Sequence, residues 1–184
     1  MHPSAECEET TCRDDACECT AQGRAQYSPL TDYMQNLYQP PVVKELHTRL
    51  GRLQPDSLRQ WGRMSVAQML AHCSVAMEMS LGETTPLPRH PLGRLIGGFV
   101  KRSLLVKGKP LERNARTHPS VLVTDTRDFE RERERLERAI DRFAKDGRAA
   151  CTRHPHFFFG PMTPEEWSTF AYIHLDHHLR QFSA

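Results

Sequence analysis

The amino-acid sequence predicts an all-α protein, and three observations support this class. Apolar residues recur at helical spacing in five segments of the chain. Residues that favour helix starts and helix ends stand at the borders of these segments. No β-hairpin pattern and no internal repeat accompanies them. We therefore expect a helical bundle.

The first helix is expected to begin at the pair Pro40-Pro41, because proline suits the first turn of a helix. Its apolar positions are Val42, Val43, Leu46 and Leu50. Gly51 interrupts the pattern, and a short further segment is expected to open at Asp56 and to end near Gly62.

The next helix is expected from Ser65 to Leu81. Ser65 favours an N-cap with Gln68 as its capping-box partner, and Gly82 favours the stop. A proline-rich linker and an amphipathic helix over residues 92–106 follow. Residues 107–126 show little pattern and are expected to form a long loop, of the kind that often covers a functional site.

Two further helices complete the prediction. Residues 128–145 carry an apolar stripe, and the alternating Arg and Glu residues around it indicate a solvated face. Gly147 is expected to end this helix. Thr163 favours the N-cap of the last helix, with Pro164 at its first position, and this helix is expected to reach Phe182.

The length of 184 residues suits one domain. We expect a disordered acidic tail over residues 1–35 and the helical domain over residues 36–184. Residues 1–33 hold seven acidic and two basic side chains, and an alternative is that translation starts near Met34. The four cysteines of the tail match no common zinc-site spacing; they are Cys7, Cys12, Cys17 and Cys19.

Composition and charge restrict the partners. The chain is 38% apolar and 26% charged, without the roughly 18 consecutive apolar residues of a membrane span. A standard secretory signal is also missing, so a cytoplasmic protein without a membrane partner is expected. The basic side chains after residue 33 are spread out and not interleaved with aromatic residues, so no nucleic-acid partner is expected.

Three histidines form the candidate chemical site. His174 and His178 are one helical turn apart, on a stripe with apolar neighbours that faces the interior. His72 lies on an apolar stripe of another predicted helix. Buried neutral imidazoles need partners for both ring nitrogens, and one shared metal ion would supply them. Ordinary core or surface histidines remain the alternative.

Three neutral imidazoles without a thiolate suit Zn²⁺ and leave one coordination position open. Nickel, iron and manganese stay as alternatives. His177 lies about 60° around the helix from His174 and is expected at the edge of the site. Cys73 is expected in the core. The loop histidines are expected to be ordinary exposed side chains; they are His90, His118, His154 and His156.

The chain resembles a known family in three segments: WGRMSVAQMLAHC, HPHFFFGPMTPEEW and YIHLDHHLRQF. They are similar to the signature segments of an uncharacterised, DinB-like domain of unknown function, over roughly residues 36–183. The wider DinB/YfiT-like superfamily implies a four-helix bundle of up-down-down-up topology, here with a short extra helix. It also implies a metal triad of one histidine on the second bundle helix and an HxxxH pair on the last. These ligands fall on His72, His174 and His178.

The resemblance also implies an activity. Related enzymes use low-molecular-weight thiols, which favours a metal-dependent thiol S-transferase-type enzyme, or a hydrolase at the same site. His177 is then the candidate proton acceptor, and Arg180 or the loop at residues 154–159 would orient an anionic substrate group. Many superfamily members read HHRGQ where this chain reads HHLRQ. The metal ligands can therefore be inferred from the superfamily, but a particular substrate cannot.

The alternative is a non-enzymatic bundle with a structural metal, or a stress-linked binding protein that dimerises through a helical face. A homodimer is one oligomeric state that the sequence leaves open. A structural zinc site would need a fourth protein ligand such as Cys73 or His177. The sequence alone therefore leaves open whether the protein is an enzyme.

Overall fold

The computed structural model describes residues 34–115 and 117–184, and this part of the chain contains five α-helices and no β-strand. The helices are α1 (Pro40–Leu50), α2 (Val66–Ser80), α3 (Pro91–Leu105), α4 (Phe129–Ala150) and α5 (Pro164–Gln181), with one 3₁₀ turn, η1 (Pro119–Val121). The predicted all-α class is confirmed. The predicted tail and its cysteines lie outside the described residues, apart from positions 34 and 35.

Local sequence determines where the helices start. The Ser65 side chain accepts the backbone N–H of Gln68 at 3.2 Å, and the Gln68 side chain returns a bond to the Ser65 N–H at 2.9 Å. Thr163 and Glu166 form the same capping box at the start of α5. Each box satisfies two backbone donors that the helix itself leaves free.

Residues 56–62, where a short further segment was expected, contain turn, irregular and bend structure and no helix. One expected helix boundary was wrong. Helix α4 continues past Gly147 to Ala150, and Gly147 is buried within it. A Cβ at Gly147 would lie 3.1 Å from the Phe143 ring, so glycine here permits close packing rather than a helix end.

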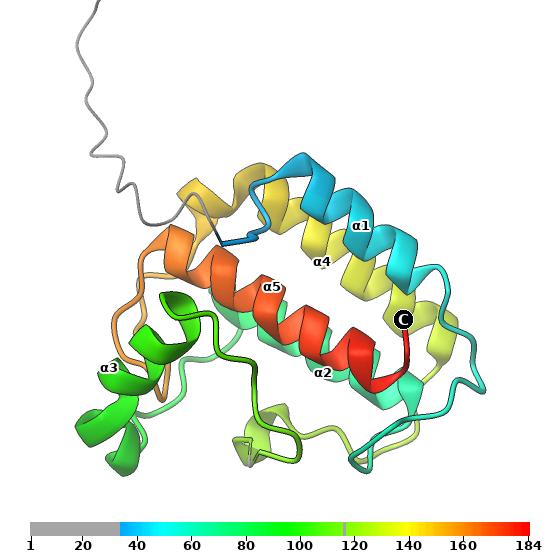
Figure 1. Ribbon diagram of the computed structural model, residues 1–184, viewed down its shortest axis with the longest axis horizontal. Helices are drawn as coiled ribbons and strands as arrows, with labels where there is room; N and C mark the ends of the chain where they lie inside the picture. The colour runs from blue at the N-terminus through cyan, green and yellow to red at the C-terminus, as the bar shows by residue number, and fades with distance from the viewer. Residues whose placement is uncertain (1–33, 116) are drawn as a thin grey trace, which may run out of the picture.

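Helices α1, α2, α4 and α5 contribute to one hydrophobic core. Fully buried side chains come from each: Leu46, Met69, Leu70, Leu136, Ile140, Phe143, Leu175 and Leu179. In Figure 1, α1 and α5 run from left to right, and α2 and α4 run from right to left. Each buried side chain of this size contributes roughly 1.5–3 kcal/mol of transfer free energy.

Helix α3 does not contribute to this core and lies beside the other four helices, at the lower left of Figure 1. It packs against α5 and the loop before it through a second, smaller cluster: Leu104, Leu105 and Phe159. In the described part of the chain, no helix combines the length and apolarity that crossing a bilayer demands.

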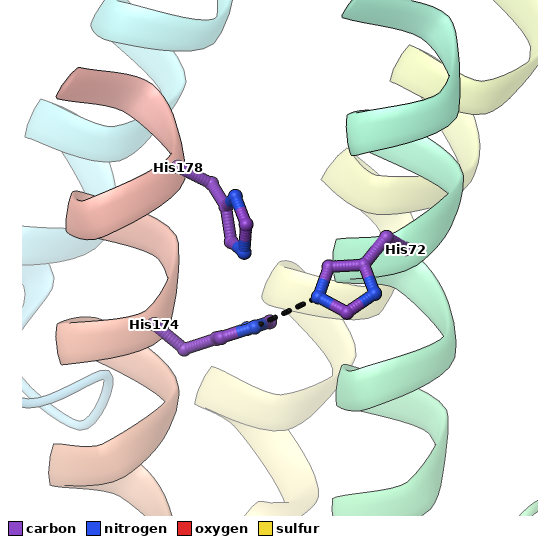
Figure 2. A group of neighbouring side chains, drawn as sticks. All are labelled: His72, His174 and His178. Carbon is purple, nitrogen blue, oxygen red and sulfur yellow. Dashed lines mark hydrogen bonds between the residues drawn. The ribbon is translucent and has the colours of Figure 1, made fainter. Parts of the chain in front are cut away.

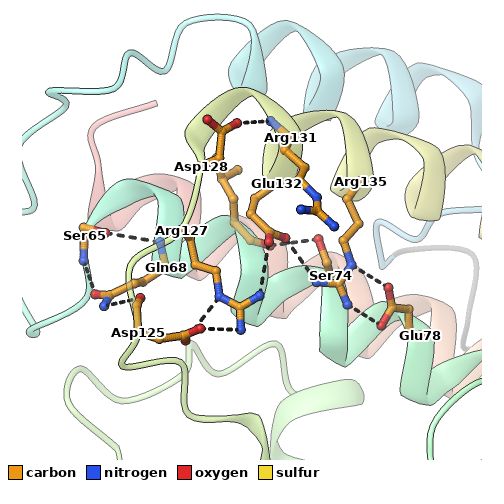
Figure 3. A network of polar contacts seen from close by, with 11 residues as sticks. Ser65, Gln68, Ser74, Glu78, Asp125, Arg127, Asp128, Arg131, Glu132 and Arg135 are labelled. Atoms are coloured by element: carbon orange, nitrogen blue, oxygen red, sulfur yellow. Dashed lines mark hydrogen bonds and ion pairs between the residues drawn. The ribbon is translucent and has the colours of Figure 1, made fainter.

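Polar contacts join α2 to α4 beside the core (Figure 3). Arg135 pairs with Glu78 of α2 through two bonds of 2.8 and 2.7 Å, and it also bonds Glu132. Glu132 is only 4% exposed and receives Arg127 from the other side. The expectation of a fully solvated charged face on α4 was therefore wrong at Glu132, which is buried and pairs with both Arg127 and Arg135.

Candidate metal centre

The three predicted histidines come together between two helices. His174 and His178 project from α5 toward His72 on α2 (Figure 2). One ring nitrogen from each lies within 4.8 Å of the other two, and the Nε2 atoms of His72 and His174 are 3.1 Å apart. His72 and His178 are buried, at 4% and 8% exposure.

The backbone before α4 determines the orientation of the His72 ring. Its Nδ1 lies 2.7 Å from the carbonyl oxygen of Val121, the last residue of η1. A carbonyl oxygen only accepts, so Nδ1 must carry the proton and donate it. The neutral ring then has an unprotonated Nε2, and this atom faces the cluster.

A side chain on α5 determines the orientation of His178 in the same way. Nδ1 of His178 lies 2.9 Å from Oε1 of Gln181. The Gln181 amide nitrogen donates to the Trp61 carbonyl at 2.7 Å, which identifies the oxygen as the atom facing His178. His178 therefore donates from Nδ1, and its Nε2 is also unprotonated when the ring is neutral.

These bonds leave the Nε2 atoms of His72 and His178 in need of a partner, which a cation would supply. Two buried acceptor nitrogens meet a third imidazole, and a single proton on His174 cannot satisfy both of them. One ion can bind all three nitrogens. Nitrogens on a tetrahedral zinc ion at about 2.0–2.1 Å would lie roughly 3.3 Å from one another, close to the 3.1 Å between His72 and His174. The donor set fits a divalent metal.

Burial keeps these rings neutral. It lowers the pKa of His178 to about 3, with His72 and His177 nearby adding to the effect and the Gln181 bond opposing it. Burial also lowers the pKa of His72 and takes the pKa of His174 well below its usual range, where the neighbouring histidines add to the shift. A neutral imidazole is the form that binds a metal, so the site needs no deprotonation at pH 7.

Among the described residues, the cluster contains no fourth His, Cys, Asp or Glu. Cys73 lies in the core as expected, with its thiol 3.7 Å from the sulfur of Met69, and burial raises its pKa. His177 stands at the edge, its ring 5.1 Å from that of His178. Three ligands with no fourth are typical of a metal site that keeps a position for substrate.

One predicted functional residue, Arg180, lies away from the triad. The Arg180 side chain is 70% exposed and forms an ion pair with Asp176, so it is not brought into the cluster. The cation at this edge is instead Arg113, whose guanidinium lies 4.3 Å above the ring of Trp61. That ring is 5.5 Å from His177, and Arg113 contributes to the lowered pKa of His177 after burial.

The expectation that His156 is an exposed loop side chain was wrong. It is 7% exposed and stacks on Phe159 at 4.5 Å, beside Phe170. Its Nδ1 accepts the backbone N–H groups of Phe158 and Phe159. Phe170 in turn stacks on His174, so an aromatic wall closes this side of the triad.

Comparison with known proteins identifies the family without naming an activity. Searches of curated proteins and of solved structures found no match. Residues 38–184, which include the triad and all five helices, match the family described as "Protein of unknown function (DUF1569)". The chain therefore belongs to the DUF1569 family.

Proposed function

We propose that this DUF1569 protein binds one divalent metal ion, Zn²⁺ before Ni²⁺, Fe²⁺ or Mn²⁺, through His72, His174 and His178. The observation that carries the proposal is the pair of Nδ1 bonds, from His72 to Val121 and from His178 to Gln181. Metal-bound histidines typically donate their second ring nitrogen to a carbonyl or carboxylate in this manner. Two rings turned so that bare Nε2 atoms converge are prearranged for a cation.

The fold is proposed to be a DinB-like four-helix bundle of up-down-down-up topology. The directions of α1, α2, α4 and α5 support this (Figure 1), as does the long connection from α2 to α4 that includes α3. The positions of the histidines support it further. One lies on the second core helix and two lie one turn apart on the last, which is the arrangement that the superfamily resemblance implies.

The activity proposed for this centre is thiol transfer to an electrophile. A bound divalent ion with an open position would lower the pKa of a coordinated low-molecular-weight thiol. His177, neutral at pH 7 because burial lowers its pKa, would accept the thiol proton. Arg113 on Trp61 offers a positive charge to an anionic group of the thiol or the electrophile.

Metal content tests the centre directly. The protein is purified, incubated with equimolar Zn²⁺, desalted and analysed by inductively coupled plasma mass spectrometry. Wild type should retain one ion per chain, and the variant His72→Ala/His174→Ala/His178→Ala should retain none. His154→Ala, at an exposed loop histidine, is the matched control and should behave as wild type. Equal metal content in the triple variant would remove the proposed site.

Activity is tested separately. Glutathione, bacillithiol and mycothiol are each offered with a chromogenic electrophile, with and without zinc. Thiol consumption that depends on zinc, and that falls in His177→Ala while metal content is unchanged, would support a transferase. Silence with all three thiols in a zinc-loaded protein would favour the non-enzymatic alternative with a structural ion.

A further inference from the structure

Helix α3 presents apolar side chains to solvent. Seven large apolar residues are strongly exposed in the described part of the chain, and five belong to α3 or follow it directly. These five form the α3 ridge: Leu92 (49%), Leu95 (83%), Ile96 (41%), Phe99 (74%) and Val106 (54%). Helical spacing places all five on one side of the helix, so they make a single surface rather than scattered exceptions.

The other side of α3 holds the helix in place. Gly93 and Gly97 lie directly against the backbone of Phe158, where a Cβ at Gly93 would come within 2.5 Å of the carbonyl oxygen. Leu104 and Leu105 are buried beside them. The helix is therefore anchored through its small residues and its C-terminal leucines, with its larger apolar residues directed outward.

The charge around the ridge has one sign. Residues 84–111 contain six basic side chains and no acidic one: Arg89, Arg94, Lys101, Arg102, Lys107 and Lys109. Arg94 and Arg102 are exposed on α3 itself, and Lys107 and Lys109 are exposed just after it. Lys101 is neutralised by Glu166 of α5, at 2.8 Å. Arg94, Arg102, Lys107 and Lys109 therefore remain as exposed positive charges on α3 or just after it.

We propose that the α3 ridge binds the surface of an anionic membrane. A helix that combines bulky apolar side chains with Lys and Arg lies in the lipid interface, its apolar face among the acyl chains and its cations at the headgroups. Such contact requires no membrane span. The apolar side chains stand on one convex helix, which suits insertion into a lipid surface.

A second copy of the chain fits this surface less well. An isologous dimer through the ridge would bring Arg94, Arg102 and their neighbours together with the same residues of the partner copy. Like charges at that spacing oppose association, whereas phosphate and carboxylate headgroups neutralise them. Charge complementarity thus selects anionic lipid over self-association.

Vesicle co-sedimentation tests the proposal with the full-length protein. One set of vesicles is phosphatidylcholine alone, and a second contains about 30% phosphatidylserine. Wild type should bind the second set at least roughly tenfold more tightly, since each cation near the surface contributes about fivefold in affinity, and added salt should weaken the binding. Leu95→Glu/Phe99→Glu should lose the binding, and Arg94→Gln/Arg102→Gln should show a several-fold weaker preference for phosphatidylserine, with Lys107 and Lys109 still present.

Leu58→Glu is the matched control, because Leu58 is 82% exposed outside the ridge and should leave binding unchanged. Circular dichroism verifies that each variant is folded, which is expected at exposed positions. Absence of binding to both vesicle sets would overturn the proposal. Vesicle binding that is unchanged in Leu95→Glu/Phe99→Glu would also overturn it. The same holds if wild type does not bind vesicles but forms a dimer in light scattering that this variant dissociates.

Discussion

At the residue scale, Gln181 is the side chain that connects the candidate centre to the rest of the chain. It accepts from His178, donates to the Trp61 carbonyl, and is 2% exposed. We expect Gln181→Leu to weaken zinc binding by about 10–100-fold, because His178 loses the partner that fixes its ring. Competition with a chromophoric chelator measures this affinity.

The same titration includes two comparisons. Gln181→Glu keeps an acceptor for His178 and should lie closer to wild type than Gln181→Leu. Gln54→Leu replaces an exposed glutamine and should not differ from wild type. Equal affinities in all four proteins would mean that ring orientation contributes nothing to the site.

His156 provides a residue-scale prediction about acid stability. Burial, with Arg89 adding to the effect, lowers its pKa in the folded protein to about 3, against about 6.5 in an unfolded chain. The unfolded state therefore binds the extra proton as pH falls from about 6.5 toward 3. The free energy of unfolding should drop by up to about 1.4 kcal/mol per pH unit through this residue alone.

His156→Asn isolates that contribution. The Asn oxygen can still accept the backbone N–H groups of Phe158 and Phe159, but it does not titrate. Urea unfolding in chelator should show a cost of roughly 1–3 kcal/mol at pH 7 from lost packing, and a shallower decline toward pH 5. In His154→Asn the free energy of unfolding should decline with pH as in wild type. If His156→Asn shows the same decline, the His156 ring is not buried in its neutral form.

Helical spacing alone places His174 and His178 on one face, whereas His72 was added to them from its own apolar stripe and from the family resemblance. The contact between His178 and Gln181 could also have been predicted, since Gln181 lies three residues after His178 on that helix. Val121 and Arg113 could not be predicted as contacts, because both lie in the patternless connection between α3 and α4, and only tertiary folding brings them to the site. His156 was misjudged for a similar reason, since the aromatic rings that bury it come partly from α5.

At the scale of elements, two adjacent glycines on α3 have opposite surroundings. A Cβ at Gly97 would overlap the Phe158 carbonyl oxygen, whereas a Cβ at Gly98 would meet nothing within 4 Å. Gly97→Ala should therefore push α3 away from the loop and cost about 1–3 kcal/mol. Gly98→Ala should be neutral or stabilise the helix by up to about 1 kcal/mol through helix propensity.

Hydrogen exchange localises this effect. Amides of α3 should exchange faster in Gly97→Ala, with α2 and α4 unchanged, because local opening affects only the element that has lost its packing. Gly98→Ala should protect the same amides at least as well as wild type. Identical exchange in both variants would mean that the α3–Phe158 contact does not hold the helix.

Helix starts were easier to predict from sequence than the C-terminal end of α4. Capping boxes at Ser65 and Thr163 are local signals, and both were present as expected. The end of α4 depended on a tertiary contact instead, since Gly147 packs on Phe143 and the helix continues. The burial of Glu132 had the same origin. Its neighbours Arg127 and Arg135 each also pair with a second carboxylate, and that environment is invisible in the Arg–Glu pattern of α4.

At the scale of the whole molecule, the proposed ion would connect α2 to α5, two helices far apart in the chain. A metal that binds only the folded state stabilises it by about 2.7 kcal/mol when free metal is at 100 times its dissociation constant. Zinc should therefore raise the thermal midpoint of wild type by several degrees in scanning calorimetry. The triple histidine variant should show no shift, and a chelator should reverse the shift in wild type.

The pH dependence of this stabilisation distinguishes a buried site from an exposed cluster. Exposed histidines become protonated below about pH 6.5, and each would then weaken zinc binding by up to tenfold per pH unit. Here burial lowers the pKa of all three rings, that of His178 to about 3. In the folded protein His174 and His178 should stay neutral at pH 5.5, and His72 should be protonated less than an exposed histidine. Zinc affinity should therefore fall far less between pH 7 and pH 5.5 than it would in an exposed cluster. Calorimetry in two buffers of different ionisation enthalpy should accordingly detect less proton release over this range than three exposed imidazoles would give. A tenfold or greater loss of affinity by pH 5.5, with proton release, would show that the rings titrate as exposed groups and that the histidine cluster is not prearranged for a metal.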